Sequence, residues 1–419
     1  MNPQQDRQPV DFHADTTLPD YGIPPAGNNA NPPLYAGRKE RRLTRRAFLV
    51  GGALLGAGGL GVGYAASRSW MLRNIGFLEQ TPAKMTRPPV PAHHAAKAPS
   101  ASTTTTPTLP ARSETLLSFT QHQQPVLAVT WSPSNQYLAS GANDGSLLIW
   151  NTQGQVQASS PQAAPVAALA ASPDGQQIAA GAGNQLLFLA AASGTTLANL
   201  QLAPQAILSS VAWSPQQPAR LVSGELNNRA IVWDAANNRV QTVFTQHTAP
   251  VEAVSWASDG QTVASSSQGG VVRVWNGGSG EELHGLYLDA QIPMRALAFA
   301  PGGGGQLAVG GDDGVLRLWN GLACQQQKLG VFGLQCVDMP LRLQGHMQAV
   351  RALGWSPDAR LLASGGDDGQ LIIWYPAQSA APVLKVPHNA PVVALAWSPT
   401  GNEIATAAGN IVTIWRLSA

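Results

Sequence analysis

Residues 362–374 read LASGGDDGQLIIW, and His346 stands eighteen positions before the serine of this stretch. A serine, a histidine and a carboxylate near one another are the residue types of a hydrolase triad. The same residue types can also form a polar network that stabilises one unit of a β-repeat. The number of times the pattern occurs separates these interpretations, because a catalytic site is expected once in a chain.

The quoted stretch belongs to a unit that recurs seven times from residue 114 onward. Each unit has an alternating apolar segment followed by a Pro, Gly or Asp turn, as in AVTWSPS and ALGWSPDA. Each ends in a short apolar strand, and the last residues of these strands are Trp150, Leu189, Trp233, Trp275, Trp319, Trp374 and Trp415. The intervals between them are 39, 44, 42, 44, 55 and 41 residues. A period of about 40–45 residues with these turns predicts four-stranded propeller blades.

On these residues the chain resembles the WD40-repeat β-propeller family over residues 114–419. The resemblance implies an all-β fold, a seven-bladed β-propeller. It also implies a hydrogen-bonded tetrad within a blade, formed by a His before the first strand, a Ser or Thr on the second, an Asp in the next turn and a Trp on the third. The two repeats with all four residues supply His122, Ser140, Asp144 and Trp150, and His346, Ser364, Asp368 and Trp374.

Fragments of the tetrad occur in other repeats. Repeat four keeps His247, Ser265 and Trp275, and repeat seven keeps His388 and Trp415. Repeat two keeps none of the four residue types. A graded loss of this kind is expected of a stabilising network, whereas a catalytic triad depends on one unique geometry. The sequence therefore favours a structural role over a hydrolase site.

Closure of the ring requires a strand from outside the seventh repeat. The sequence ends four residues after Trp415, which leaves this repeat room for three strands. Residues 114–120, ETLLSFT, have apolar residues suited to a strand. WD40 propellers close by laying such an N-terminal strand on the last blade, and the resemblance implies that residues 114–120 pair with residues 410–416.

The charge is low and unevenly divided. Charged residues make up 11% of the 419 residues, against roughly 25% in an average soluble protein. Residues 1–112 carry 13 Lys or Arg and 6 Asp or Glu, whereas residues 113–419 carry 12 and 17. An acidic main body argues against a nucleic-acid partner, because phosphate binding needs a basic surface.

The positive charge is concentrated in residues 37–50, GRKERRLTRRAFLV, directly before an uncharged run over residues 47–66. The residues TRRAFL resemble the twin-arginine export signal, in which Ser or Thr precedes two arginines, any residue, and Phe-Leu. The residues that match it are Arg45, Arg46, Phe48 and Leu49. The resemblance implies a bacterial cell and export of an already folded protein. The alternative is a solvated basic tail ahead of a buried helix.

The uncharged run has two possible fates. A small-residue pattern at Gly63 and Ala65 would allow cleavage by a signal peptidase. If the run is retained, its twenty residues at about 1.5 Å each just cross a bilayer core of about 30 Å. More Lys and Arg precede the run than follow it, which places the N-terminus in the cytoplasm. In either case we expect the main body on the extracytoplasmic side, held at the cell membrane through residues 47–66 if they are retained.

These features divide the chain into four parts. Residues 1–43 are rich in Pro, Asn and Gln and are expected to be a disordered tail with a basic end. Residues 44–67 are the signal or single membrane-spanning helix. Residues 68–113 form a linker rich in Pro, Thr and Ala, and residues 114–419 form the propeller.

Two motifs suggest metal or redox chemistry. GGDDG occurs at 310–314 and 365–369 but lacks the spacing of an EF-hand, and its aspartates occupy the turn position of the repeat. We therefore predict no metal and no cofactor. Cys324 and Cys336 are the only cysteines and both lie in the 320–340 insertion. They predict one disulfide in an exported protein, or two free thiols if the protein stays in the cytoplasm.

The resemblance also implies a binding surface. In WD40 propellers the His loops and the Asp turns lie on one face, which commonly binds peptides or proteins. In this chain the partner face would include Gln123, Asn143, Asn227, Thr248, Gln268, Asp312, Met347, Asp367 and Asn389. We expect a non-enzymatic scaffold, displayed outside the cytoplasm, that binds a protein or peptide and no small-molecule substrate.

Two other functions are considered. An extracytoplasmic propeller enzyme, similar to a lactonase or a quinoprotein, would need a central metal or cofactor site built from several inward-facing polar residues. In this chain the residues of those types coincide with repeat positions. A cytoplasmic scaffold tethered with inverted topology is disfavoured by the distribution of arginines.

Overall fold

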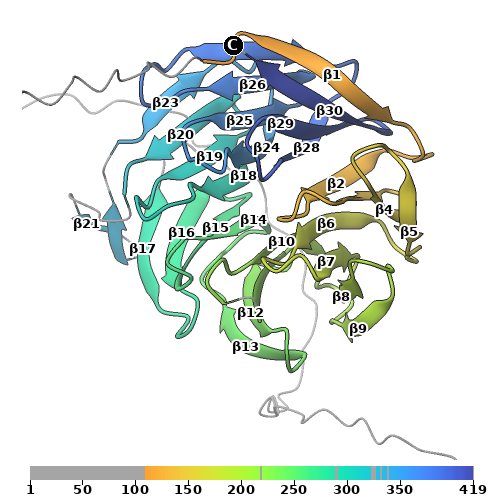
Figure 1. Cartoon of the computed structure of the whole chain (residues 1–419). Coiled ribbons are helices and arrows are strands. Elements are labelled where there is room, and N and C mark those ends of the chain that lie inside the picture. The colour runs from red at the N-terminus through yellow and green to blue at the C-terminus, as the bar shows by residue number, and fades with distance from the viewer. Residues whose placement is uncertain are drawn as a thin grey trace, which may run out of the picture. The chain divides into compact units, whose positions relative to one another are not determined.

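The computed structural model describes residues 109–418, apart from 218, 288–290, 322–326, 331–332 and 337–338. In this part of the chain every regular element is a strand and there is no helix. The strands form seven sheets that are arranged as blades around a central axis (Figure 1). The predicted all-β, seven-bladed propeller is therefore confirmed for the described residues.

The first strands of neighbouring blades contact one another around the axis. In blades one to seven they are β2 (Val126–Trp131), β6 (Val166–Ala171), β10 (Leu208–Trp213), β14 (Val251–Trp256), β18 (Met294–Phe299), β24 (Val350–Trp355) and β28 (Val392–Trp397). The second strands are β3 (Leu138–Ala142), β7 (Gln177–Ala182), β11 (Arg220–Glu225), β15 (Thr262–Ser267), β19 (Leu307–Gly311), β25 (Leu362–Gly366) and β29 (Glu403–Ala408).

The third strands carry a Trp near their ends, except in blade two, where Leu189 takes its place. They are β4 (Leu147–Trp150), β8 (Gln185–Ala190), β12 (Arg229–Asp234), β16 (Val271–Asn276), β20 (Val315–Trp319), β26 (Gln370–Trp374) and β30 (Ile411–Ser418). The outer strands are β5 (Val156–Ser159), β9 (Thr196–Gln201), β13 (Arg239–Phe244), β17 (Glu282–Tyr287), β23 (Leu341–Gln344), β27 (Pro382–Pro387) and, for blade seven, β1 (Arg112–Phe119).

The closing strand lies where the sequence predicts it, with shifted bounds. β1 begins at Arg112 and pairs antiparallel with β30, with Thr115 opposite Trp415 and Phe119 opposite Val412. Phe119 is buried and stacks on Trp150 of blade one, with ring centroids 4.2 Å apart. The strand therefore completes blade seven and also contacts the neighbouring blade, which joins the two ends of the ring.

The 320–340 insertion contributes strands that the sequence analysis did not predict. β21 (Gln327–Gly330) and β22 (Gly333–Cys336) form an antiparallel pair. β22 then pairs in parallel with the outer strand β17, with Gly285 opposite Gln335, so the sheet of blade four has six strands. An insertion in blade five therefore covers the outer edge of blade four, an edge that would otherwise be open to another chain.

The second and third strands of the blades are buried on both faces. β15 and β20 are buried at every position, and β25 is as well. In a strand packed between two neighbouring blades, the sequence is a continuous run of apolar or small residues, and polar residues do not alternate with apolar ones. Small size is required at some positions: at Gly365, an added Cβ would lie 2.5 Å from a methyl group of Val392 in the next blade.

A second Trp, at the end of the first strand and often followed by Ser-Pro, joins one blade to the blade before it. The indole of Trp213 donates to the carbonyl of Ala170 at 3.0 Å, and that of Trp397 donates to Gly354 at 2.9 Å. The equivalent bonds of blades four and six have donors Trp256 and Trp355. The Trp at the end of the first strand therefore has a structural role that is independent of the tetrad.

Several sequence predictions fall on residues that the structure does not describe. They include the export motif, the run over residues 47–66 and Cys324. Cys336 ends β22 but its side chain lies outside the description, so the predicted disulfide is untested. Over the described ranges, no helix is long and apolar enough to cross a membrane.

Candidate functional site

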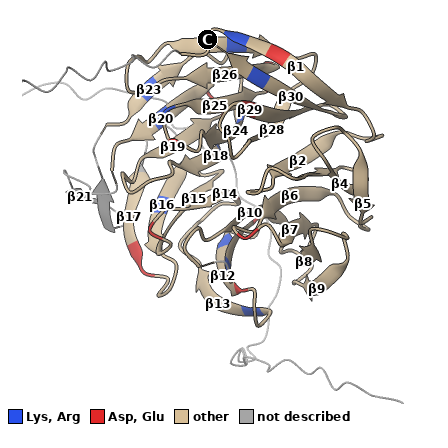
Figure 2. Ribbon diagram, in the orientation of Figure 1, with Lys and Arg blue, Asp and Glu red and all other residues tan. Residues whose placement is uncertain are grey.

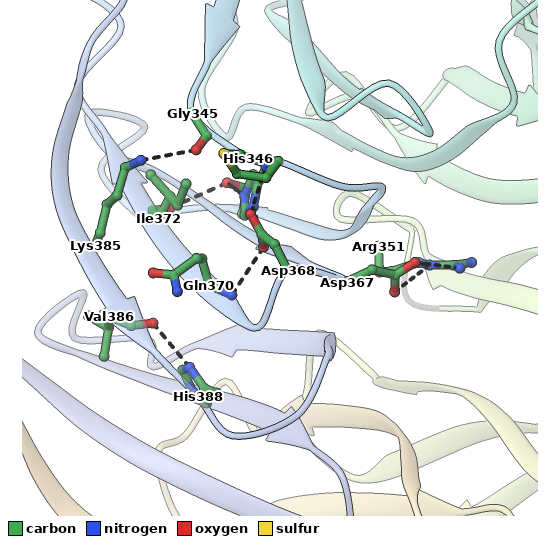
Figure 3. Close-up of polar contacts among 12 residues, drawn as sticks. Gly345, His346, Arg351, Asp367, Asp368, Gln370, Ile372, Lys385, Val386 and His388 are labelled. Carbon is green, nitrogen blue, oxygen red and sulfur yellow. Dashed lines mark hydrogen bonds and ion pairs between the residues drawn. The ribbon is translucent and has the colours of Figure 1, made fainter.

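Blade six contains the complete tetrad. His346 Nε2 lies 2.7 Å from Ser364 Oγ, and His346 Nδ1 lies 3.0 Å from Asp368 Oδ1. The indole of Trp374 donates to Ser364 Oγ at 2.8 Å. The Asp368 carboxylate also accepts from the backbone of Met347 and Gln370. Figure 3 shows Asp368 directed at His346.

These distances are those of a Ser-His-Asp triad, but the environment excludes nucleophilic attack. The Ser364 side chain is 0% exposed, so no substrate reaches its oxygen. That oxygen already accepts a hydrogen bond from Trp374. Burial lowers the pKa of His346, although the neighbouring Asp368 carboxylate acts in the opposite direction. The set therefore stabilises the blade, because it satisfies buried polar groups that would otherwise be costly.

Blade one differs from the predicted tetrad at its carboxylate. His122 Nε2 lies 2.7 Å from Ser140 Oγ, and Trp150 donates to the same oxygen at 3.1 Å. His122 Nδ1, however, contacts Ser146 Oγ at 2.9 Å and not Asp144. Asp144 is exposed, and the pKa of its carboxyl is lowered chiefly by a hydrogen bond from the Ser146 hydroxyl. A serine therefore stands between the imidazole and the carboxylate.

The physical reason lies two residues before each aspartate. In blade six this residue is Gly366, where an added Cβ would lie 2.6 Å from His346 Nδ1 and 2.8 Å from Asp368 Oδ1. In blade one the residue is Ala142, which carries that Cβ. A direct contact between imidazole and carboxylate thus requires glycine, and the sequence analysis did not take this residue into account.

Two further blades keep the imidazole without a carboxylate. In blade four, His247 Nε2 lies 2.7 Å from Ser265 Oγ. In blade seven, His388 Nε2 lies 2.9 Å from Thr406 Oγ1, which also accepts from the Trp415 indole. Thr406 was not predicted from the sequence, although it stands eighteen residues after His388, as Ser364 does after His346.

Blade five replaces the imidazole with a guanidinium. Arg317 is 3% exposed and its Nη2 lies 2.5 Å from Asp313 Oδ2. Gly311 again stands two residues before the aspartate, and an added Cβ there would lie 2.8 Å from Asp313 Oδ1. The GGDDG motif therefore accommodates an aspartate that pairs with a buried side chain in two neighbouring blades, the Arg317 guanidinium in blade five and the His346 imidazole in blade six.

The predicted partner face surrounds one mouth of the central channel. The first strands line the channel, and the second residues of these strands are, in blade order, Leu127, Ala167, Ser209, Glu252, Arg295, Arg351 and Val393. Only blades four to six contribute charges to this ring. Charged residues are sparse over the strands of the propeller (Figure 2), which makes this sector distinctive.

The charges at the mouth are paired with two of the predicted face residues. Arg295 donates to Asp312 at 2.8 Å and to Glu252 at 2.9 Å. Arg351 donates to Asp367 at 2.7 Å. Asp367 and Asp368 are consecutive but point in different directions, one to the channel mouth and the other to the tetrad (Figure 3). One turn therefore positions both networks.

A cavity of about 350 Å³ opens at this mouth, lined in part by Glu252, Arg295, Arg351 and Asp367. Gln268 hydrogen-bonds to Glu252 and extends the network into the loop of blade four. Glu252, Arg295 and Arg351 were not predicted from the sequence. Their signal was a charged residue at the second position of an otherwise apolar strand, as in VEAVSW, MRALAF and VRALGW.

The other predicted face residues do not join this network. Met347 is 88% exposed, and Asn227 is half-buried. The remaining ones are exposed, namely Gln123, Asn143, Thr248 and Asn389. Among the described residues, no group of three or more His, Cys, Asp or Glu side chains is placed to hold a metal ion.

Comparisons with known proteins agree with this geometry. The family model WD40 (WD domain, G-beta repeat) matches residues 113–151, 238–276, 338–375 and 382–416. Each match covers all or most of the first three strands of one blade, in blades one, four, six and seven, together with the outer strand that precedes them, which is β1, β13, β23 or β27. They support the WD40 family for the propeller.

Three plant proteins are among the curated relatives. Cell division cycle 20.1, cofactor of APC complex, from Arabidopsis thaliana is 26% identical over 245 residues, which cover 47% of this chain and 52% of that protein. Protein FIZZY-RELATED 2 from the same plant is 30% identical, covering 48% and 38%. B-type cell cycle switch protein ccs52B from Medicago truncatula is 28% identical, covering 48% and 38%. The chain thus spans about half or less of these relatives.

Proposed function

We propose that this protein is a non-enzymatic scaffold that binds a protein or peptide partner at the channel mouth of the His-loop face. The observation that carries the proposal is the paired sector of Glu252, Arg295, Arg351 and their carboxylates around a cavity of about 350 Å³. Paired charges at an interface set register and exclude wrong partners more than they add affinity. The exposed Met347 offers an adaptable apolar contact on the same face.

The relatives support a protein partner. One of them is described by its name as a cofactor of the APC complex. That description belongs to the relative, and this chain spans about half of its length. We therefore take from it the class of partner, a protein, and leave the partner's identity to experiment.

The proposal also assigns the propeller to the extracytoplasmic side of a bacterial membrane. It rests on Arg45, Arg46, Phe48 and Leu49 of the TRRAFL motif and on the uncharged run that follows. Replacing Arg45 and Arg46 with lysines is expected to leave a folded protein in the cytoplasm. Protease accessibility in intact cells measures this, and unchanged surface exposure would remove this part of the proposal.

Partner binding is tested by crosslinking in intact cells with variants of the mouth. The double variant Arg295→Gln and Arg351→Gln is expected to reduce recovery of the wild-type partner at least about tenfold, a loss of roughly 1.4 kcal/mol. Arg416→Gln is the matched control, because Arg416 is an ion-paired arginine on blade seven away from the mouth. Equal loss in both variants, or in neither, would contradict binding at the mouth.

A further inference from the structure

We infer that the seam between blades three and four contains a binding site for an oxyanion, with the guanidinium of Arg220 as its cation. Arg220 begins β11, at the turn from the first to the second strand of blade three. The His loops and Asp turns lie at the opposite ends of these antiparallel strands. The site is therefore on the other face of the propeller and does not depend on the proposed partner face.

The guanidinium is buried and incompletely bonded. Arg220 is 8% exposed. Its Nε donates to Gln241 Oε1 at 3.0 Å and its Nη1 donates to Gln217 Oε1 at 3.2 Å. Within the described residues, Nη2 is buried and has no hydrogen-bond partner. The group also lies 5.1 Å from the ring of Trp256 in blade four. Two neutral amides and a ring disperse the charge but do not neutralise it.

Other arginines of low exposure in this propeller have a carboxylate. Arg317 pairs with Asp313 at 2.5 Å and Arg273 pairs with Glu282 at 2.6 Å. No ion pair to Arg220 is formed by any side chain in the described part of the chain. Burial lowers the pKa of Arg220, and no neighbouring charge opposes that shift. A buried cation without a counter-ion is costly, so a negative ligand would be favoured there.

An exposed glycine lies beside the buried Nη2. Gly278 is exposed, and a Cβ added to it would lie 3.7 Å from Arg220 Nη2. The loop backbone is held by Asn276, whose side-chain oxygen accepts from Gly278 and Ser279 at 2.9 Å. Because Nη2 is buried, an oxyanion reaches it only when this loop or the guanidinium shifts slightly, and Gly278 has no side chain to block the approach. Since Nε and Nη1 are already used, the free Nη2 suits one oxygen of a carboxylate or phosphate.

The first experiment measures thermal unfolding of the full-length protein in sodium phosphate, sodium acetate and sodium chloride at equal ionic strength. We expect phosphate or acetate to raise the melting temperature by about 1–3 °C more than chloride. The same anions should shift the side-chain nitrogen resonance of Arg220. Arg220→Gln is expected to lose the response. Arg239→Gln is expected to keep it, because Arg239 is an exposed, paired arginine of the same blade.

The source of the anion is distinguished by the amides of N-acetyl-phosphoserine and N-acetyl-aspartate. A larger response to these than to free phosphate and acetate assigns the site to a partner's side chain. A smaller response assigns it to a small anion. Both results support the site.

A second variant tests the site even if Arg220→Gln fails to fold. The backbone φ angle of Gly278 lies outside the left-handed region, so a residue with a side chain can adopt this conformation without strain. Gly278→Asp should supply the carboxylate within the chain, raise the melting temperature and abolish the anion response. Gly278→Asn is its neutral control. The inference is overturned if phosphate and acetate act like chloride and the two Gly278 variants are equally stable.

Discussion

Blade six and blade four carry the same histidine in different surroundings. In blade six both ring nitrogens of His346 are bonded, one to Ser364 and the other to Asp368. In blade four, His247 Nε2 is bonded to Ser265, but its buried Nδ1 has no partner among the described residues. The aspartate position of blade four is Gly269.

The difference shows which part of the network a blade needs. Ser265 Oγ still accepts a hydrogen bond from the Trp275 indole at 3.1 Å, as Ser364 Oγ does from the Trp374 indole. The histidine, the hydroxyl and the indole therefore connect the loop before the first strand to the second and third strands without any carboxylate. The carboxylate adds a charge-assisted bond at the loop end, where it also holds the backbone of Met347.

The largest expected effect is a pH dependence dominated by blade four. Burial, assisted by the nearby Arg273 charge, lowers the pKa of His247 from 6.5 to about 3. The unfolded chain takes up a proton near pH 6.5 while the folded chain does not, so stability falls as the pH drops from 6.5 toward 3. The loss should reach about 3 kcal/mol at pH 4.

Chemical denaturation at several pH values measures this loss. His247→Gln should flatten the pH dependence more than His346→Gln, because Asp368 partly offsets the effect of burial on the pKa of His346. Equal flattening by the two variants would contradict the difference between the blades.

Removing the imidazole should cost more in blade six. His346→Ala leaves Asp368 and Ser364 without their common partner, and we expect about 2–3 kcal/mol of lost stability. His247→Ala removes the imidazole from Ser265 alone, which keeps the Trp275 indole, and should cost about 1–2 kcal/mol. Urea denaturation near pH 7 compares them, and a larger loss for His247→Ala would reverse the proposed ranking.

A single methyl group should convert blade six toward blade one. Gly366→Ala places a Cβ 2.6 Å from His346 Nδ1, which forces the imidazole and the carboxylate apart. The expected cost is about 1–2 kcal/mol by thermal or urea denaturation. Ser267→Ala at the same place in blade four is the matched control: it adds no atom, removes only the hydroxyl that donates to the carbonyl of Val271, and should cost about 0.5–1 kcal/mol. If Gly366→Ala is as stable as the wild type, the contact between His346 and Asp368 does not require glycine at this position.

The smallest effect is expected from rebuilding the carboxylate in blade four. The double variant Ser267→Gly and Gly269→Asp recreates the Gly366 and Asp368 arrangement, and stability should change by less than about 1 kcal/mol. NMR titration should show the pKa of His247 rising from about 3, since a carboxylate favours the protonated ring. Gly269→Asp alone should raise it less, because Ser267 still carries the Cβ that displaces the carboxylate.

Much of the fold was predictable because it depends on local patterns that recur. The seven strand ends at Trp150 to Trp415 and the WSP turns specify the number of blades and their strand order. The closing strand was predictable because β1 has apolar residues and blade seven lacked a fourth strand. The pairing of β22 with β17 was not, because parallel pairing with another blade depends on tertiary contacts and leaves no periodic signal.

The candidate site was predictable only in part, because some of its contacts also depend on the tertiary structure. The serine that separates His122 from Asp144 depends on one methyl group at Ala142, and the effect of that group is visible only in three dimensions. Arg295 and Arg351 lie on strands, whereas the sequence analysis sought the face among loop residues. Their position in the strand was a usable signal, since it repeats from blade to blade.

The pairing of β1 with β30 has a consequence for synthesis. Phe119 and Val412 are opposite each other in the sheet but nearly 300 residues apart in the chain. At about 5–20 residues per second a ribosome needs roughly 15–60 s to make the residues between them. During that interval β1 has no partner, and its Leu116, Leu117 and Phe119 are available to a chaperone. Closure of the ring thus occurs only after all seven blades have been made.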